Sequence, residues 1–294
     1  MYQPPSNHHA SLMTTPSTEQ DLRNEITRLQ TALSTLHPPS PSPTTQPLSS
    51  HSHPLLLLSD SALPLGSFAF SSGLESHLCH HPNTPINLPH FLSLSLTSLA
   101  STTLPYLLAA HRNPRDLSTL DETLDACTLC PVARRASVAQ GRALLTLWER
   151  AFRGEVGEGE ARGALDGFVR RVKMMAVSAR AQDDGDGDGD PEPSAHFPPI
   201  WGALTCALSI PLQSAAYTFL LNHAKAVCSA AVRAGVMGPY AAQGILASKW
   251  LQAEIEGVMR EWWDVEVVDA GQGVPMLDLW VGRHELLYSR IFNS

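Results

Sequence analysis

The sequence predicts an all-α protein, built as a single helical-bundle domain of about eight to ten helices. Three observations support this fold class. Apolar residues recur three and four positions apart through most of the chain, which is the spacing of one face of a helix. Hydrophobic residues make up 43% of the 294 residues, and charged residues only 16%. Clear strand-and-turn punctuation is absent, so we expect helices that bury much of their surface.

The predicted helices follow one another from residue 68 to residue 263. The clearest is 212–234, in which Leu212, Ala216 and Phe219 begin a long apolar face. Residues 91–96 alternate with strand period, but leucines on either side restore helical spacing, and we interpret the segment as helical. The candidate helices are 68–80, 88–110, 116–128, 132–153, 160–180, 199–209, 212–234 and 240–263.

The first 54 residues form an N-terminal extension ahead of the predicted domain, residues 55–294. Leucine and isoleucine at heptad spacing between Leu22 and Leu36 predict one short amphipathic helix. The stripe spans about two heptads, fewer than a coiled coil needs, so we favour a loosely attached helix over self-association. Residues 37–54 are rich in proline and serine and predict a disordered linker.

The net charge of −8 comes mainly from one loop. Residues 183–195 hold six acidic residues and no basic one, and we predict a disordered acidic insert. Its Asp-Gly repeats resemble a calcium-binding loop, but Ala195 stands where that loop requires a bidentate glutamate. The rest of the chain is close to neutral, which argues against a nucleic-acid partner. No lysine follows a glycine, so no phosphate-binding G-K-[ST] loop is present.

Five scattered cysteines and an N-terminus without a secretory signal predict a reducing, cytoplasmic setting. Two windows without charged residues, 76–111 and 193–224, raise the question of membrane spans. Prolines and serines interrupt the first window, and Pro211 interrupts the second. A spanning helix needs about 20 predominantly apolar residues. We therefore interpret both windows as buried helices and expect no membrane association.

Few residues are arranged for catalysis or metal binding. Cys127 and Cys130 form one C-x-x-C pair without a second pair at zinc spacing, and we favour two small hydrophobic thiols near a helix end. Cys79, His80 and His81 are donors that suit nickel, copper or zinc. Three adjacent residues on a helix cannot all face one ion, so further ligands would be needed. The residues alone favour a helical binding or assembly protein over an enzyme.

Four stretches carry a more specific pattern. They are the turn-containing segment 55–75, the segment 134–142, residues 196–247 beginning His-Phe-Pro-Pro-Ile-Trp-Gly, and the tail 282–294. In this order they resemble the urease accessory protein F (UreF) family, most closely its eukaryotic, fungal-like members. The resemblance covers about residues 55–294. Departures from the family pattern include Ser67 for a second glycine in the turn, Tyr240 for a glutamine, and Gly282 for a small polar residue.

The resemblance implies an all-α, non-enzymatic scaffold that holds no cofactor of its own. Such proteins bind urease accessory protein D (also called H) and recruit the GTPase UreG to apo-urease. Nickel is then inserted in a GTP-dependent step, so nickel and GTP are handled by the partners. It also implies a homodimer within the complex. The alternative is a helical protein that itself binds nickel through Cys79, His80 and His81.

The tail is the strongest candidate for partner binding that the resemblance offers. The residues assigned to it are Arg283, His284, Glu285, Tyr288, Ser289 and Arg290. On a helix, Arg283 and Arg290 would lie on one side, two turns apart. A short segment rich in arginine and tyrosine is typical of an interface hot spot. The other interpretation is that Glu285 and Ser289 tie the terminus to its own domain.

The segment 55–75 is expected to form a structural turn before the first long helix. Pro64, Gly66, Phe68 and Gly73 are its key positions, with a helix opening at Phe68. A structural role is favoured over a contact role for the proline and the first glycine. Glu75, which ends the segment, is expected to face a partner.

Two further residues have a structural and a functional interpretation. Arg142 is expected at an interface, and a role as an arginine finger towards a bound GTPase is the less favoured alternative. His196 is a buried polar anchor before Pro198 in the favoured interpretation, and a transient nickel ligand in the other.

Overall fold

The computed structural model describes residues 19–36, 51–181 and 193–293. Contacts divide the chain into two compact units, 1–47 and 48–294. The described part of the first unit is the helix α1 (Glu19–Leu36), on which Leu22, Ile26 and Leu29 are exposed. Residues 37–50 and 182–192 lie outside the described residues, so the disorder predicted there stays a prediction. At the ends of the two predicted segments, 37–54 and 183–195, the structure differs: residues 52–54 begin α2, and Ser194 and Ala195 are buried.

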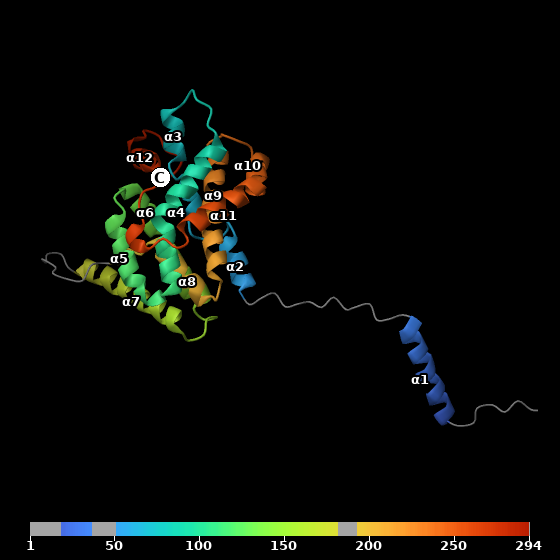
Figure 1. Cartoon of the computed structure of the whole chain (residues 1–294). Coiled ribbons are helices and arrows are strands. Elements are labelled where there is room, and N and C mark those ends of the chain that lie inside the picture. The colour runs from blue at the N-terminus through green and yellow to red at the C-terminus, as the bar shows by residue number, and fades with distance from the viewer. Residues whose placement is uncertain (1–18, 37–50, 182–192, 294) are drawn as a thin grey trace, which may run out of the picture. The chain divides into compact units, whose positions relative to one another are not determined.

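The second unit is all-α, as predicted (Figure 1). Its described residues contain eleven α-helices, short 3-10 turns and no strand. The helices are α2 (Ser52–Ser59), α3 (Leu74–His80), α4 (Leu88–Arg112), α5 (Leu117–Cys127), α6 (Pro131–Leu147), α7 (Glu160–Ala181), α8 (Phe197–Ala207), α9 (Leu212–Arg233), α10 (Pro239–Leu246), α11 (Lys249–Trp262) and α12 (Pro275–Arg283). The 3-10 turns are η1 (Ser67–Ala69), η2 (Pro114–Asp116), η4 (Val267–Asp269) and η5 (His284–Leu286), and a π-helical turn, η3 (Trp148–Phe152), extends α6.

The predicted helix 68–80 is interrupted in the structure. Ser72 and Gly73 have φ angles of 52° and 84°, which a helix cannot contain. The helix α3 therefore begins at Leu74, and Phe68 lies in η1 instead of opening a helix. Ser67 lies inside that turn, and its Oγ donates a hydrogen bond to Gln140 Oε1 at 2.9 Å.

The predicted helix 240–263 is also divided. Ser248 has extended backbone, and its Oγ accepts the N–H of Leu251 at 3.1 Å as the N-cap of α11. A serine that can cap the start of a following helix is the local sequence signal for this division into two helices. The helices α2 and α12 are additional to the predicted set, because both are short and their apolar periodicity covers only two or three turns.

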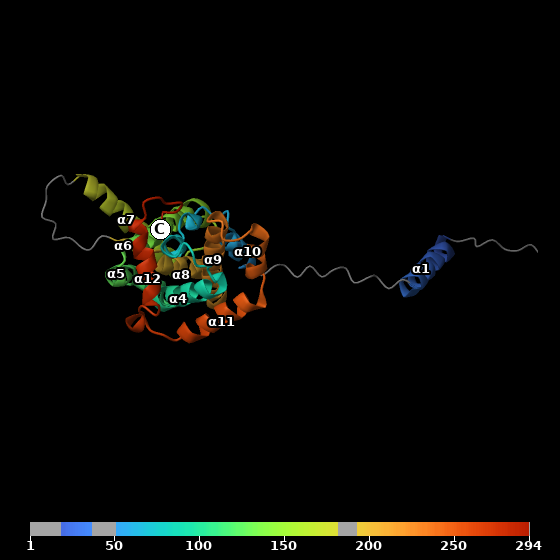
Figure 2. The same ribbon diagram turned by 90° about the horizontal axis from the view of Figure 1, so that it is seen from above.

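The long helix α4 lies at the centre of the second unit, with α8, α9 and α11 packed around it (Figures 1 and 2). The leucines Leu92, Leu96, Leu104 and Leu107 are completely buried on it. At about 25 cal/mol per Å² of buried apolar surface, each such side chain contributes on the order of 2 kcal/mol to folding. This helix organises the hydrophobic core.

Pro105 lies inside α4, and the backbone carbonyl that it leaves without a helical partner is hydrogen-bonded elsewhere. Proline has no N–H, so the carbonyl of Ser101, four residues earlier, loses its helical partner. That carbonyl accepts the N–H of Gly271 at 3.0 Å. By leaving this carbonyl without a helical partner, the proline lets α4 bind the segment that leads into α12.

A close crossing of α8 over α4 explains the glycine of the His196–Gly202 motif. A Cβ atom at Gly202 would lie 2.2 Å from the carbonyl oxygen of Leu107. Only glycine permits this approach. By length and composition α4 would also be able to cross a membrane, but 61% of its apolar window is buried within the protein, as in a core helix.

Candidate functional site

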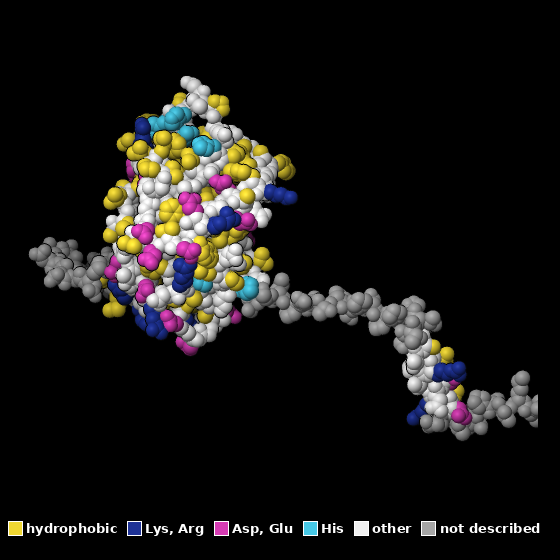
Figure 3. All heavy atoms as spheres, viewed as in Figure 1, with side chains coloured by type: hydrophobic (Ala, Val, Ile, Leu, Met, Phe, Trp, Pro, Cys, Tyr) yellow, Lys and Arg dark blue, Asp and Glu magenta, His cyan; other side chains and the backbone are white. Residues whose placement is uncertain are grey.

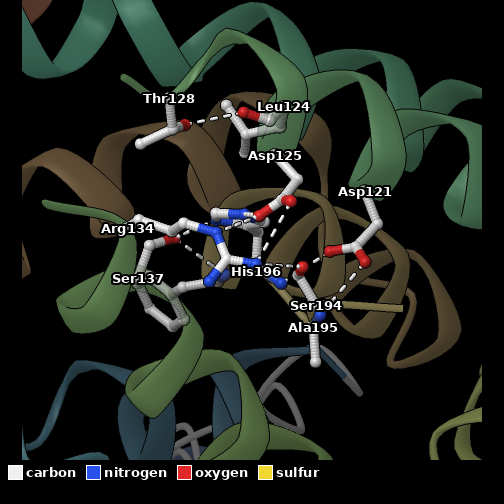
Figure 4. A network of polar contacts seen from close by, with 10 residues as sticks. Asp121, Leu124, Asp125, Thr128, Arg134, Ser137, Ser194, Ala195 and His196 are labelled. Carbon is white, nitrogen blue, oxygen red and sulfur yellow. Dashed lines mark hydrogen bonds and ion pairs between the residues drawn. The ribbon is translucent and has the colours of Figure 1, made fainter. Parts of the chain in front are cut away.

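A buried polar cluster around His196 joins three helices (Figure 4). The imidazole Nδ1 lies 3.0 Å from Ser137 Oγ on α6, and Nε2 lies 2.8 Å from Asp125 Oδ1 on α5. The backbone N–H groups of Ala195 and His196 donate to the carboxylate of Asp121 at 3.0 and 2.6 Å. Both ring nitrogens have partners inside the chain, which fits a buried anchor better than a metal ligand.

Arg134 completes this cluster by holding the second carboxylate. Its Nε donates to Asp125 Oδ1 at 2.6 Å, and its Nη2 donates to Ser194 Oγ at 2.9 Å. Burial by itself raises the pKa of Asp125, but hydrogen bonds from Arg134, His196 and Ser194 outweigh it and lower the pKa to about 2. The carboxylate is therefore charged at neutral pH and stabilises the cluster.

The spacing of Arg134, Ser137 and Gly141 now has a structural explanation. These residues lie three and four positions apart on one side of α6, and all three face residues 194–197. A Cβ atom at Gly141 would lie 2.0 Å from the carbonyl oxygen of Ala195, which has a φ of 70°. Two motifs that are separate in the sequence thus form one docking surface.

Asp121 and Asp125 were not predicted as site residues. Their spacing of four positions on one face of the predicted helix 116–128 was a signal that sequence reasoning missed. Asp121 is fully buried, although nearby apolar residues such as Leu120 and Leu124 suggest an ordinary core face. Its partners are backbone N–H groups 74 and 75 residues away, which no local pattern reveals.

A second buried cluster is organised by Glu75 on α3, which is only 4% exposed. The carboxylate accepts the Nε2–H of His284 at 2.9 Å. It also accepts the backbone N–H groups of Ile291 at 2.5 Å and Phe292 at 3.1 Å. Glu75 and His284 thus face each other within the chain, contrary to the expectation that both contact a partner.

The end of the chain is held at the same place. Phe292 is buried, and the guanidinium of Arg233 lies 4.3 Å from the centre of its ring. The N–H of Asn293 donates to the carbonyl of Ala69 at 2.8 Å. The last described residues are therefore fixed against η1 and α9.

Between these two anchors, residues 285–290 form an exposed segment that we name the tail loop. Tyr288 and Ser289 are exposed without helical structure, and Leu286 and Arg290 are also exposed. The prediction that Arg283 and Arg290 share one side of a helix is wrong, because the helix ends at Arg283 and only one 3-10 turn follows. The segment is a loop, tied down at both ends.

Ion pairs shape the tail loop from one side. Glu285 pairs with Arg135 on α6 and lies 3.4 Å from Arg290 Nη1. Arg290 Nη2 also donates to the carbonyl of Glu285 at 2.6 Å, which closes the loop on itself. The hydrogen bond from Arg135 is the main reason that the pKa of Glu285 is lowered. Because these pairs are exposed, solvent screens them and each contributes little to stability.

Comparison with known proteins identifies the family. The family model that describes UreF matches residues 83–249, more than half of the chain. This chain belongs to the UreF family.

Relatives from fungi and plants extend the similarity beyond those residues. A urease accessory protein UreF-like of Schizosaccharomyces pombe is 37% identical over 82% of this chain and 97% of its own length. Urease accessory protein 6 of Cryptococcus neoformans is 26% identical over 82% of this chain and 96% of its own. Urease accessory protein F of Arabidopsis thaliana is 29% identical over 81% and 90%.

In this UreF family member, the predicted turn is built on two glycines in left-handed backbone. Gly66 has a φ of 71°, and Gly73 precedes α3. A Cβ atom at Gly73 would come within 3.3 Å of Trp280 and Val281, so this glycine also lets α12 pack closely. The exposed Phe68 contributes its carbonyl, which accepts a hydrogen bond from Arg233, and Pro64 lies exposed in the preceding turn.

The remaining candidates are not assembled into one site. Cys79 is exposed, and no group of three His, Cys, Asp or Glu residues among the described residues is placed to hold a metal ion. Cys79, His80 and His81 therefore do not form the three-donor site considered as an alternative. Arg142 is exposed on α6, and its side chain has no hydrogen bond or ion pair within the described part of the chain.

A cavity of about 320 Å³ lies between α4, α12 and the junction of α5 with α6. The residues that matter for its chemistry are Tyr106, Cys127, Cys130, Ser137 and His223. Burial lowers the pKa of His223 to about 4, and its Nε2 lies 2.7 Å from Ser95 Oγ. Burial, followed by the neighbouring Cys127, raises the pKa of Tyr106. The His223 ring and the Tyr106 hydroxyl are therefore neutral at physiological pH.

Proposed function

We propose that this chain is a non-catalytic urease maturation factor that acts in the cytoplasm. Together with urease accessory protein D (also called H), it brings the GTPase UreG to apo-urease for GTP-dependent nickel insertion. Membership of the UreF family supports this role, since relatives that cover four fifths of the chain are named urease accessory proteins. Nickel and GTP are handled by the partner proteins, and this chain holds no resident cofactor.

The observation that carries the proposal is the anchored tail loop. Glu75 binds the chain on both sides of it, at His284 and at Ile291 and Phe292. The loop is therefore presented in a fixed shape before a partner arrives, and binding costs less conformational entropy. Tyr288 is fully exposed at its centre, and exposed tyrosine and arginine are the residues most enriched in interface hot spots.

Hydrophobic side chains next to the loop extend this surface. Leu286 and Ile291 within the tail, and Met276 and Leu279 on α12, are all more than half exposed. Figure 3 shows hydrophobic side chains over the part of the surface where α12 and the chain end lie. Apolar surface of this kind fits a protein partner. We propose accessory protein D as the partner of this surface and a second copy of the chain as a further contact within the complex.

The hydrogen bonds that His196 and Glu75 make inside the chain support a scaffold over a catalyst. His196 has hydrogen bonds at both ring nitrogens, and Glu75 accepts three. Groups engaged in this way hold helices together and are not available to a substrate. Arg142, by contrast, is exposed on α6 and is free to approach a bound GTPase.

The binding surface can be tested without disturbing the anchors. We expect Tyr288→Ala and Leu286→Glu to weaken co-purification with accessory protein D by about tenfold or more, as for hot-spot residues. Met174→Glu on α7, which is 70% exposed, is the matched control and leaves binding unchanged. Full binding by both tail-loop variants would contradict this assignment. Removing the whole tail is less informative, because it also removes His284 and Phe292 from the interior.

Two measurements test the steps that follow binding. Deleting the gene abolishes urease activity while leaving urease protein at its normal level, and excess nickel partly restores it if maturation is the missing step. The GTP hydrolysis rate of UreG in the complex, compared with Arg142→Ala, tests the arginine finger. An unchanged rate removes that role and leaves Arg142 as an interface residue.

A further inference from the structure

Two histidines lie next to each other at the end of α3, one inside the helix and one at its C-terminal cap. His77 and His81 are four positions apart, and their ring centres are 4.6 Å apart with an angle of 30° between the planes. Histidine side chains gather on the surface at the end of the molecule where α3 lies (Figure 3). This pair differs from the consecutive residues Cys79, His80 and His81, which point in different directions around the helix.

The hydrogen bonds of the pair leave nitrogen lone pairs available. His81 Nδ1 lies 2.9 Å from the carbonyl oxygen of His77. A carbonyl can only accept, so Nδ1 carries the proton and Nε2 keeps a free lone pair, the arrangement that orients metal-binding imidazoles. His77 Nδ1 is buried and has no hydrogen-bond partner in the described residues.

The separation of the rings matches what one shared ion requires. A metal–nitrogen bond of about 2.1 Å places the centres of two neighbouring imidazole ligands roughly 4.5–5 Å apart. We propose that His77 and His81 form a binding site for a divalent transition ion of the class that prefers imidazole, namely Ni²⁺, Cu²⁺ or Zn²⁺. The protein supplies two ligands, and water fills the other positions, so the ion exchanges readily.

A tryptophan on α12 lies beside the pair and would report the binding of an ion. The Trp280 ring of α12 lies edge-on to His77, with ring centres 4.3 Å apart, and 6.4 Å from His81. An ion at the pair would therefore lie beside α12, the helix that leads into the tail loop. A bound paramagnetic ion such as Ni²⁺ or Cu²⁺ quenches the fluorescence of a neighbouring indole. The site is independent of the proposed recruitment of partners, which does not require an ion here.

The test uses the purified full chain titrated with NiCl₂, followed by calorimetry and tryptophan fluorescence. We expect one saturable ion whose binding quenches part of the fluorescence, and loss of that quenching in Trp280→Phe. His81 is exposed and its removal spares the core, so His81→Ala serves as the main variant. Its affinity falls at least tenfold, since even the loss of a group that orients a ligand costs about 10- to 100-fold. His77→Gln has the same effect.

Matched controls separate this site from other histidines of the chain. His80→Ala and Cys79→Ser keep the affinity of the unaltered protein within about twofold, because neither residue contributes a ligand. Mg²⁺, which prefers oxygen ligands, neither binds nor quenches. Equal nickel affinity in His81→Ala and the unaltered protein would overturn the proposal, as would affinity lost only in the Cys79 or His80 variants. Circular dichroism of each variant confirms that helix content is retained.

Discussion

Glu75 and His284 lie in contact in the interior although 209 residues separate them in the sequence, with 2.9 Å between His284 Nε2 and Glu75 Oε2. The contact links the first long motif of the chain to its last. Because the same carboxylate also accepts two backbone N–H groups near the chain end, a single acidic side chain fixes both ends of the tail loop. The partner-binding candidate therefore depends on a residue that no partner reaches.

Replacing Glu75 with alanine is expected to destabilise the protein strongly. The change leaves His284 and two backbone N–H groups buried without an acceptor, and each buried donor left unpaired costs about 1–3 kcal/mol. Glu75→Gln, which keeps one carbonyl oxygen, costs less. Urea unfolding followed by circular dichroism measures the loss. The control is Glu285→Gln, whose exposed ion pairs predict little change in stability. Similar stability of the two variants would contradict the role assigned to Glu75.

Gly141→Ala is expected to disrupt the docking of α6 on residues 194–197. The added methyl group would overlap the Ala195 carbonyl, 2.0 Å away, and relieving the clash must move a helix or break the hydrogen bonds of His196. We expect a loss of about 3 kcal/mol or more, measured by thermal unfolding. Gly163→Ala on α7 is the matched control, because nothing lies within 4 Å of its Cβ position. It should gain up to about 1 kcal/mol from helix propensity.

The lowered pKa of Asp125 predicts that the protein loses stability in acid. Its pKa is about 2 in the folded protein, against about 3.9 when unfolded. The unfolded state therefore binds more protons between these values, so the stabilisation is present above about pH 4 and is lost as the pH falls towards 2. Because the side chain is 30% exposed, we expect about 1–2 kcal/mol. The free energy of unfolding of Asp125→Asn should change less between pH 5 and 2.5 than that of the unaltered protein.

The lowered pKa of His223 predicts a second dependence of stability on pH, in a less acidic range. Its folded pKa of about 4 lies below the unfolded value of about 6.5. A depressed histidine pKa means that the unfolded state binds more protons, so stability is present above pH 6.5 and declines as the pH falls to about 4, by up to about 3 kcal/mol. His223→Gln should remove this decline, while the exposed His81→Ala keeps it. Unfolding curves at pH 7.5, 5.5 and 4.5 distinguish the two.

Local patterns identified most helices well. The periodic segments 88–110 and 212–234 correspond to α4 and α9 within two residues, because each has an apolar face long enough to define its period. Errors occurred where the backbone changes direction within a hydrophobic run, at Ser72–Gly73 and at Ser248. A positive φ depends on what packs against the turn, and here that is α12, two hundred residues later.

The candidate site was predictable only in outline. Residue patterns identified the tail and the segment 134–142 as functional candidates. The patterns did not show which of their residues lie inside the protein and which lie on its surface. Glu75 and His284 are internal, whereas Leu286 and Tyr288 are exposed. Asp121 and Asp125 were missed because their partners are backbone N–H groups and side chains of distant segments.

The sequence alone determined the all-α class, the position of most helices and membership of the UreF family, because apolar periodicity and ordered motifs are local properties of the chain. Only the tertiary structure decided which polar residues became internal anchors and which remained on the surface. A carboxylate such as Glu75 has the same local pattern in either case. Its role follows from whether donors from elsewhere in the chain satisfy it when water is removed, and that depends on how distant segments pack.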